Sequence, residues 1–213
     1  MLADRIKALA PSPTLAIQAK AKAMRAQGID VISFGAGEPD FDTPERIKEA
    51  AIRALRKGYT KYTEASGIVE LREAVCRKLK RDNGLDYEPA DVLISVGAKH
   101  TLYNAVVALL NPGDEVLIPA PYWVSYPEQV KLVDGVPVAV SAEEADGFQV
   151  DPDRLAAAIT PRTRAVVINS PNNPTGAVFS PAALRAVGQL AVKHDLLVIS
   201  DECYEALTYE GRH

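Results

Sequence analysis

Polar side chains gather after two short apolar runs in the second half of the sequence. These side chains are Asn169, Asn172, Asn173, Asp201 and Tyr204. The runs that precede them, Ala165–Ile168 and Leu196–Ile199, flank one amphipathic segment and predict a strand–helix–strand unit. Open α/β sheets bind their ligands at the carboxyl ends of their strands, so the spacing predicts a ligand site.

Asp201 has the most specific chemistry of the five. It follows Leu-Leu-Val-Ile-Ser, a pattern that predicts a buried strand. An ionised carboxylate in that position loses hydration unless a cation or several hydrogen-bond donors meet it. One interpretation is structural, a cap for the next turn or a salt bridge to an arginine. The other is functional, a carboxylate that holds a protonated ring nitrogen.

The asparagines allow the same two interpretations. Pro174 disfavours helical geometry at Asn173 and Gly176 permits a sharp turn, so the segment could be loop chemistry alone. Three asparagines at one strand end exceed what a turn requires. Their amides could instead donate to and accept from a ligand ring.

Two further segments could bind parts of a ligand. Gly97-Ala98-Lys99 joins an apolar run to a helical segment, and the free amides of a helix start attract phosphate, although such junctions are common in α/β folds. Trp123 is the only tryptophan and follows another apolar run among prolines and tyrosines. It could stack on a flat heterocycle or simply join the core.

Composition narrows the function classes. The 213 residues are 47% hydrophobic, which suits a globular chain with a sizeable core. The 24 lysines and arginines face 28 acidic residues without a basic run, so nucleic acid is not an expected partner. Cys76 and Cys203 give neither a disulfide framework nor metal-ligand spacing, and no metal site is expected. The pattern lacks a signal peptide and a membrane-length apolar run, which indicates a cytoplasmic protein without a membrane partner.

Five apolar runs and the helical segments between them define the expected fold. The runs are Val92–Val96, Glu115–Ile118, Pro137–Val140, Ala165–Ile168 and Leu196–Ile199. Most are apolar on both faces, as strands covered by helices on both sides must be. Asp151-Pro152 and Ser180-Pro181 mark the starts of two intervening helices. We therefore expect an α/β fold of three layers around a mostly parallel, doubly wound sheet.

The region before residue 91 is expected to be mostly helical. Its first predicted helix covers Thr14–Gln27. A second starts with Thr43 as a hydroxyl cap and Pro44 at its first position, and a third runs from Ile68 to about Arg81 and ends at Asn83-Gly84. Asp30–Phe34 predicts a small strand that leads into residues 35–40. There Asp40 replaces the third glycine of a dinucleotide-binding loop, which excludes that function. A tight turn or a close backbone approach to a ligand fits the segment instead.

The candidate parts together match one cofactor. A phosphate-binding helix start, an aromatic plate, ring-edge donors and a carboxylate for a ring nitrogen fit pyridoxal 5'-phosphate (PLP). The motifs GAGEPDFDTP, KYTEASGIVELREAV, SVGAK, PYWVSYPE, NSPNNPTG and SDECYE follow one another along the whole chain. With these motifs the sequence resembles the class I aminotransferases of fold type I, most closely the bacterial aspartate aminotransferase subgroup.

The resemblance implies a role for each cofactor residue. Asp201 would pair with the pyridinium nitrogen of PLP. Asn173 and Tyr204 would hydrogen-bond the ring hydroxyl oxygen, and Trp123 would stack on the ring. Backbone amides at Ala98 and Lys99, after Gly97, would hold the phosphate, and Tyr62 would reach the phosphate of the partner subunit in a homodimer.

The resemblance also implies a site for amino-acid and 2-oxo-acid substrates. Gly37, Trp123, Asn173 and Lys99 would line it. A lysine at the position of Lys99 is associated with acidic substrate side chains in the subgroup, which favours aspartate or glutamate. A solvated lysine in the first turn of a helix is the structural alternative.

The same resemblance implies a division into two domains and the absence of one catalytic motif. Residues 1–40 would form an N-terminal arm and a segment of the small domain, and residues 41–213 an incomplete PLP-binding large domain. The family's Schiff-base lysine lies in an S-K-x-x-x-x-x-G-x-R-x-G block after the D-E-x-Y strand, and the 213 residues contain no such block. No residue is therefore assigned a catalytic role, and we expect the chain not to transaminate alone.

Three functions stay open at this level. The first is an aminotransferase that moves an amino group from aspartate, or a related amino acid, to a 2-oxo acid such as 2-oxoglutarate through PLP. The second is a PLP enzyme of another specificity, either a prephenate or aromatic aminotransferase or a carbon–sulfur lyase. The third is a non-catalytic module that binds a cofactor or a partner.

Overall fold

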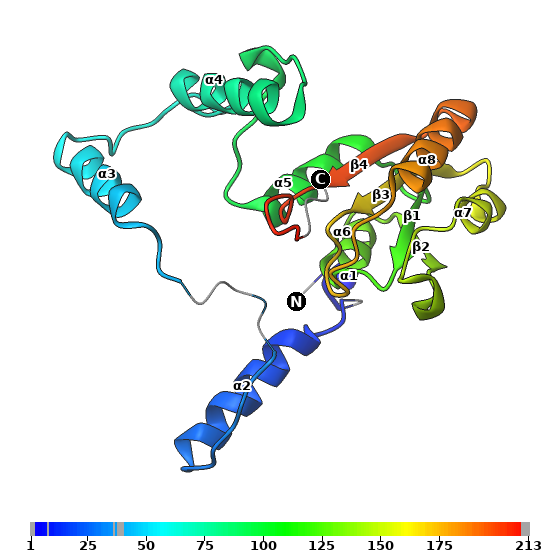
Figure 1. The fold of residues 1–213 in the computed structure, drawn as a ribbon, viewed down its shortest axis with the longest axis horizontal. Helices are drawn as coiled ribbons and strands as arrows, with labels where there is room; N and C mark the ends of the chain where they lie inside the picture. The colour runs from blue at the N-terminus through cyan, green and yellow to red at the C-terminus, as the bar shows by residue number, and fades with distance from the viewer. Residues whose placement is uncertain (1–2, 8, 36, 38–40, 210–213) are drawn as a thin grey trace. The chain divides into compact units, whose positions relative to one another are not determined.

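The computed structural model describes residues 3–7, 9–35, 37 and 41–209. Figure 1 shows the ribbon with its helices and strands labelled. By its internal contacts the chain divides into two compact units. The first unit comprises Met1–Ala10 and Gly97–His213, and the second comprises Pro11–Val96. These units group residues by their contacts and do not correspond to the small and large domains of the family. The domain boundary expected at residue 40 therefore stays a prediction.

A parallel four-stranded sheet forms the centre of the first unit. Its strands are β1 (Glu115–Ala120), β2 (Val136–Ser141), β3 (Thr163–Asn169) and β4 (Leu197–Asp201). They lie in the order β2-β1-β3-β4, and every neighbouring pair is parallel. Both β1 and β3 are almost wholly buried, as the apolar runs predicted.

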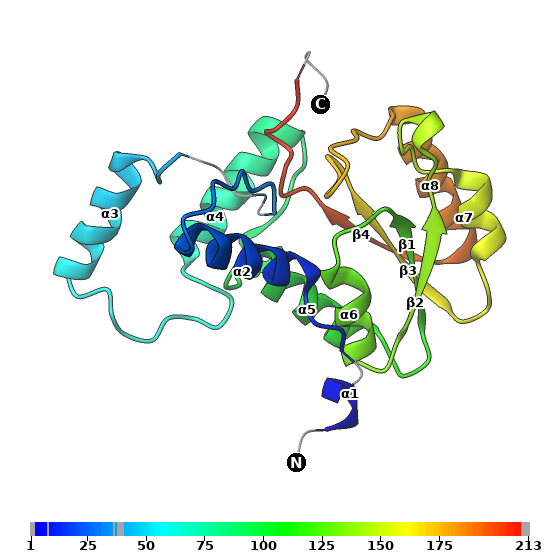
Figure 2. The same ribbon diagram turned by 90° about the horizontal axis from the view of Figure 1, so that it is seen from below.

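Helices cover both faces of this sheet. They are α5 (Ala98–Leu109), α6 (Ser125–Leu132), α7 (Pro152–Ala158) and α8 (Pro181–His194). Figure 2 shows α5 and α6 on one side of the sheet and α7 and α8 on the other. The expected three-layer, doubly wound α/β fold is thereby confirmed. The short helix α1 (Asp4–Lys7) and a 3-10 turn, η3 (Glu144–Asp146), complete the unit.

Alternate residues of the central strands enter two separate cores. Val116 and Ile118 of β1 pack with α5 and α6, whereas Leu117 packs with α7 and α8. Because successive strand residues point to opposite faces, a strand needs an apolar residue at every position to fill both cores. This requirement explains the continuous apolar runs.

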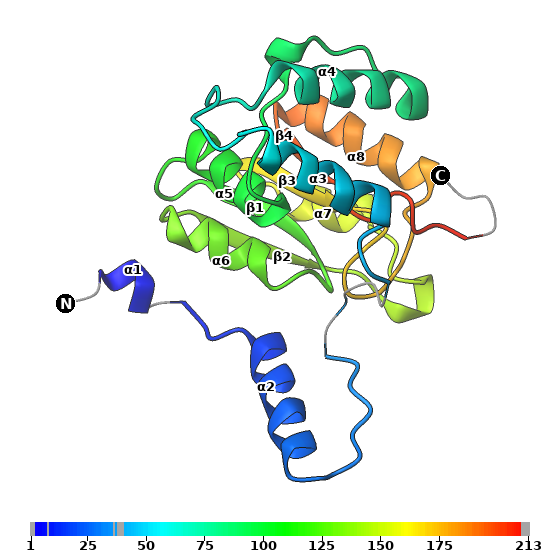
Figure 3. The ribbon, with the colours of Figure 1, turned by 90° about the vertical axis from the view of Figure 1, so that its left-hand side faces the viewer.

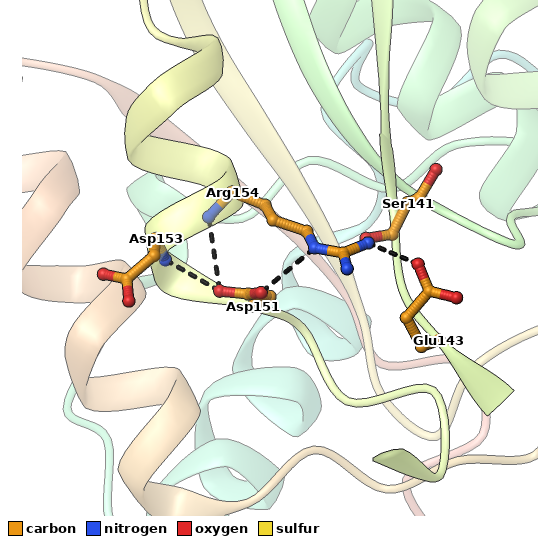
Figure 4. Close-up of polar contacts among 5 residues, drawn as sticks. All are labelled: Ser141, Glu143, Asp151, Asp153 and Arg154. Atoms are coloured by element: carbon orange, nitrogen blue, oxygen red, sulfur yellow. Dashed lines mark hydrogen bonds and ion pairs between the residues drawn. The ribbon is translucent and has the colours of Figure 1, made fainter. Parts of the chain in front are cut away.

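Local caps fix the starts of two helices as the sequence predicted. The Ser180 hydroxyl accepts a hydrogen bond from Ala183 N (3.1 Å) at α8. At α7, an Asp151 oxygen accepts from Asp153 N (2.9 Å) and Arg154 N (3.2 Å) (Figure 4). The Arg154 guanidinium also pairs with Glu143, which ties α7 to the segment after β2.

The second unit is helical in its described residues. It contains α2 (Pro13–Ala26), α3 (Glu45–Arg56), α4 (Val69–Lys78), a π-helical turn η1 (Leu79–Asn83) and a 3-10 turn η2 (Pro89–Asp91). Gly84 ends η1 in the left-handed conformation, as the Asn83-Gly84 pair predicted. The N-cap of α3 is Pro44 without a side-chain hydrogen bond, so the predicted cap at Thr43 is wrong.

Two predicted strands of this unit are also wrong. Neither Asp30–Phe34 nor Val92–Val96 is a strand in the described part of the chain. Ile94 N donates to Ser66 O in a loop (2.9 Å), while Leu93 and Val96 are exposed by 58% and 88%. An apolar run indicates that a segment needs burial, but a strand forms only where a second strand completes its hydrogen bonds.

Candidate functional site

The carboxyl ends of β3 and β4 bring two predicted residues together. Asn169 ends β3, Asp201 ends β4, and the two are direct partners in the parallel register. Both are buried, at 5% and 9% exposure. The side-chain Nδ2 of Asn169 donates to the backbone oxygen of Asp201 (3.0 Å), which locks the two strand ends at this level.

The loop after β3 separates the roles of the other two asparagines. Asn172 Oδ1 accepts from Thr175 N (3.2 Å) and Thr175 Oγ1 (2.9 Å), so Asn172 builds the turn. Asn173 N donates to Asn169 Oδ1 (2.7 Å), and the Asn173 side chain makes no hydrogen bond to the part of the chain that the structure describes. The side-chain amide of Asn173 is therefore available to meet a ligand.

Two donors hold the Asp201 carboxylate. Oδ2 accepts from the hydroxyl of Tyr126 (2.7 Å) and Oδ1 accepts from Cys203 N (3.1 Å). No arginine pairs with Asp201 among the described residues, so the salt-bridge interpretation is not observed. The contact with Cys203 N does cap the following turn. A carboxylate can accept more bonds than these two, which leaves capacity for a further donor.

The surroundings of Asp201 keep its neighbours protonated. Burial, followed by the hydrogen bond and charge of Asp201, raises the pKa of the Tyr126 phenol far above its ordinary value. Burial and the nearby Asp201 carboxylate likewise raise the pKa of the Cys203 thiol. Cys203 is therefore a poor nucleophile, and Tyr126 stays a hydrogen-bond donor.

Trp123 provides an aromatic surface against Tyr126, the residue that bonds this carboxylate. Its ring is half-buried, packs against the α5–α6 core, and meets Tyr126 edge-to-face with centroids 5.5 Å apart and planes at 86°. Lys99 Nζ lies 4.9 Å from the Trp123 ring centroid. The same ring thus contacts a cation and the residue that holds Asp201.

The start of α5 has the features of an anion site. Gly97 is its N-cap, with φ 82° and ψ 161°, and no side chain caps the helix. The amides of His100 and Thr101 both donate to Gly97 O (3.0 and 3.1 Å), and the amides of Ala98 and Lys99 precede these first helical bonds. With the Lys99 ammonium nearby, this donor set suits a phosphate.

Three predicted site residues are placed less specifically. Tyr204 is half-buried in the turn after β4 and contributes to the raised pKa of Tyr126, which puts it near the Asp201 group. Tyr62 and Gly37 are exposed in the second unit. Their predicted contacts with the cofactor and the substrate stay predictions, and residues 36 and 38–40 lie outside the described residues.

Two buried side chains of this site were not singled out from the sequence. From the sequence, Tyr126 is only one of the tyrosines near Trp123, and Gln129 has no assigned role. Gln129 Nε2 donates to the Lys99 backbone oxygen (2.8 Å). Their one sequence signal is a three-residue spacing on a helix, which places both on one face.

Other kinds of site are not seen in the described residues. These contain no cluster of three or more side chains suited to a metal ion. Within the same part of the chain, no helix has the length and apolar character needed to cross a membrane.

Comparison with known proteins identifies the family. The family model for class I and II aminotransferases matches residues 29–213. The chain belongs to this family. It is 56% identical over 210 residues to the aspartate aminotransferase of Geobacillus stearothermophilus, covering 99% of this chain and 53% of that protein. It is 53% identical over 212 residues to the aspartate/prephenate aminotransferase of Thermus thermophilus, covering 100% and 55%.

Solved structures of the family share the fold. The aspartate aminotransferase of Thermus thermophilus with maleate superposes with a TM-score of 0.97 at 53% identity, covering all of this chain and 56% of that one. The chain thus spans about half the length of the relatives it matches. Aminotransferases of this family use PLP, whose phosphate, flat ring and ring nitrogen correspond in kind to the anion site, the aromatic surface and the carboxylate described above.

Proposed function

We propose that these 213 residues form the cofactor-holding part of a PLP-dependent aminotransferase. The enzyme would move an amino group from aspartate, or a related amino acid, to a 2-oxo acid such as 2-oxoglutarate. The observation that carries the proposal is the buried Asp201 carboxylate, held by Tyr126 and Cys203 with capacity left for one more donor. The family and the names of the relatives support the same reading.

The side chains around Asp201 would bind and orient the ring. The carboxylate would accept a hydrogen bond from the ring nitrogen and keep that nitrogen protonated, because a buried anion stabilises a neighbouring cation. Asn173, whose amide is free, and Tyr204 would bond the ring hydroxyl oxygen, and Trp123 would stack on the ring face. When bound, PLP supplies an electron sink for the electron pair left on the substrate α-carbon.

The start of α5 would hold the phosphate. The amides of Ala98 and Lys99 and the positive end of the helix dipole attract an anion, and Gly97 has no side chain that could obstruct it. In the homodimer that we propose, Tyr62 of a second copy would also reach this phosphate. The cytoplasmic location expected from the sequence is part of the same proposal.

Substrate choice within the family has two candidates. Lys99 places an ammonium beside Trp123, which suits an acidic substrate side chain, and Gly37 would complete that side of the site. Relatives carry both the aspartate and the aspartate/prephenate names, so prephenate is the second candidate for the amino acceptor. Both acceptors, 2-oxoglutarate and prephenate, carry two carboxylates, and both agree with a cation at Lys99.

The lysine that would bind PLP covalently is the next part of the proposal. We propose that the Schiff-base lysine is supplied by residues outside these 213, and that this chain alone binds PLP noncovalently without transaminating. The check is borohydride reduction of the chain with PLP, followed by dialysis and intact-mass measurement. No single lysine should carry the cofactor one-to-one. Stoichiometric labelling of one lysine would contradict this part of the proposal.

Equilibrium binding of PLP tests the core of the proposal. The wild-type chain should bind PLP, and Asp201→Asn should weaken binding about tenfold, since a hydrogen bond to a charged group contributes about 1.5 kcal/mol or more. Glu202→Gln is the matched control, because Glu202 is exposed and follows Asp201 directly. Absence of PLP binding, or equal affinity of wild type and Asp201→Asn, would reject the proposal.

A further inference from the structure

Helix α6 carries two buried polar side chains one turn apart. Tyr126 and Gln129 are exposed by only 4% and 6%. Their i, i+3 spacing puts them on one face of the helix. That face packs toward α5 through Val130 of the same core, and Figure 3 shows α5 and α6 running beside each other. Burying polar groups costs free energy unless they are bonded, so the partners of these two side chains are informative.

Tyr126 links two parts of the proposed ring site. Its hydroxyl donates to Asp201 Oδ2 (2.7 Å), and its ring meets Trp123 edge-to-face (5.5 Å between centroids). A phenylalanine would keep the ring contact and lose only the bond to the carboxylate. The phenol therefore fixes the direction in which Asp201 presents its remaining acceptor positions.

Gln129 reaches the proposed phosphate site. Its Nε2 donates to the backbone oxygen of Lys99 (2.8 Å), the second residue of α5. A helical carbonyl in that position already accepts from the N–H four residues later. The helix does not need the extra donor, but the bond fixes the first turn of α5 relative to α6.

We propose that Tyr126 and Gln129 are positioning residues that set the separation between the phosphate-binding amides of α5 and the ring-nitrogen partner Asp201. The inference rests on the proposed function. PLP is a small rigid molecule, so its phosphate and its ring nitrogen can be bound together only if the two sites are spaced to match. One helix face that bonds to both sites maintains that spacing.

Three ligands distinguish the contribution of Tyr126 at the ring-nitrogen site from that of Gln129 at the phosphate site. They are PLP, an analogue of PLP in which C–H replaces the ring nitrogen, and pyridoxal, which lacks the phosphate. Tyr126→Phe should weaken PLP about tenfold and leave the ring-carbon analogue unchanged, because only PLP uses Asp201. Gln129→Met should reduce the preference for PLP over pyridoxal by about threefold to tenfold and leave the ratio of PLP to the analogue unchanged.

Matched controls remove the same groups elsewhere. Tyr103→Phe takes a hydroxyl from a tyrosine of α5 that is 37% exposed, and Gln189→Met makes the glutamine change at an exposed position of α8. Neither control should alter any of the three affinities. Thermal unfolding of each variant establishes that the compared chains are folded.

The outcomes distinguish the positioning claim from the proposed function. If Tyr126→Phe weakens PLP and the ring-carbon analogue equally, and Gln129→Met weakens PLP and pyridoxal equally, both residues are only structural and the inference is overturned. If wild type fails to bind PLP, the proposed function falls and the inference with it. Wild-type binding with the predicted ligand-specific losses supports both.

Discussion

The side chain of Asn169 bonds to both neighbours of the proposed ring site. Its Oδ1 accepts from Asn173 N (2.7 Å), and its Nδ2 donates to the backbone oxygen of Asp201 (3.0 Å). One buried amide thus joins the loop after β3 to the end of β4. The spacing between Asn173 and Asp201, which would bond the ring hydroxyl oxygen and the ring nitrogen, depends on it.

Replacing Asn169 by leucine should destabilise the chain. The change removes two buried hydrogen bonds and leaves a backbone N–H and a backbone oxygen without partners, at a cost of about 2 kcal/mol. Thermal unfolding followed by circular dichroism should show a midpoint lowered by about 4–8 °C. Asn111→Leu, at an exposed position, is the control and should shift the midpoint by less than about 2 °C. Equal shifts in the two variants would contradict the role of Asn169.

Glu115, the first residue of β1, should make the free energy of unfolding depend on pH. It is 4% exposed, and hydrogen bonds from Thr160, then from Arg162 and Thr163, lower the pKa of its carboxyl against the effect of burial. A carboxyl with a lowered pKa in the folded state stabilises fully above its unfolded pKa, near 4.5, and loses that contribution as the pH falls through the folded value. The Arg162 side chain is 70% exposed, so solvent weakens its share.

The test is urea unfolding at neutral pH and at about pH 3.5. Glu115→Gln should be less stable than wild type at neutral pH, and the difference should shrink at the acid pH. Glu144→Gln removes an exposed carboxylate and should show no such pH-dependent difference. A Glu115→Gln deficit that stays constant across the two pH values would contradict the prediction.

The Tyr126 phenol should not ionise in the alkaline range where exposed tyrosines do. Burial is the largest cause of its raised pKa, and the hydrogen bond and charge of Asp201 add to it. Absorbance at the phenolate wavelength should therefore give the same titration for wild type and Tyr126→Phe up to about pH 11, while ordinary tyrosines titrate near pH 10. One fewer tyrosine titrating in the variant below that pH would show that Tyr126 is not held as described.

Gly97 should tolerate no side chain without cost. Its φ of 82° with ψ of 161° lies in a region that only glycine adopts readily, although the space around its Cβ position is open. Gly97→Ala should destabilise the chain by about 1–3 kcal/mol and weaken PLP more than pyridoxal, because it moves the phosphate-binding amides. Gly147→Ala also has a positive φ, 62°, outside the site, and should leave the ratio of the two ligands unchanged.

The strand-end residues were predictable because local patterns define them. Apolar runs locate β3 and β4, and parallel strands bring their carboxyl ends together, so Asn169 and Asp201 could be expected side by side. Caps such as Ser180 depend on neighbours three residues away and were equally readable. These interactions need no knowledge of distant segments.

Contacts between distant segments could not be read in the same way. Tyr126 and Asp201 are 75 positions apart, and their bond depends on how α6 packs against the sheet. Val92–Val96 shows the opposite error, since its composition predicts a strand but the segment is not a strand in the described part of the chain. The direction in which a helix packs, and whether a segment meets a second strand, depend on the whole fold. A local sequence pattern does not contain that information.

The central claim is that Asp201 pairs with a protonated ring nitrogen of bound PLP. The most direct measurement is the ¹⁵N chemical shift of PLP labelled at the ring nitrogen, bound to the wild-type chain and to Asp201→Asn. We expect a pyridinium shift with wild type and a neutral pyridine shift with the variant at the same pH. An unprotonated ring nitrogen in the wild-type complex, or the same shift in both complexes, would contradict the claim.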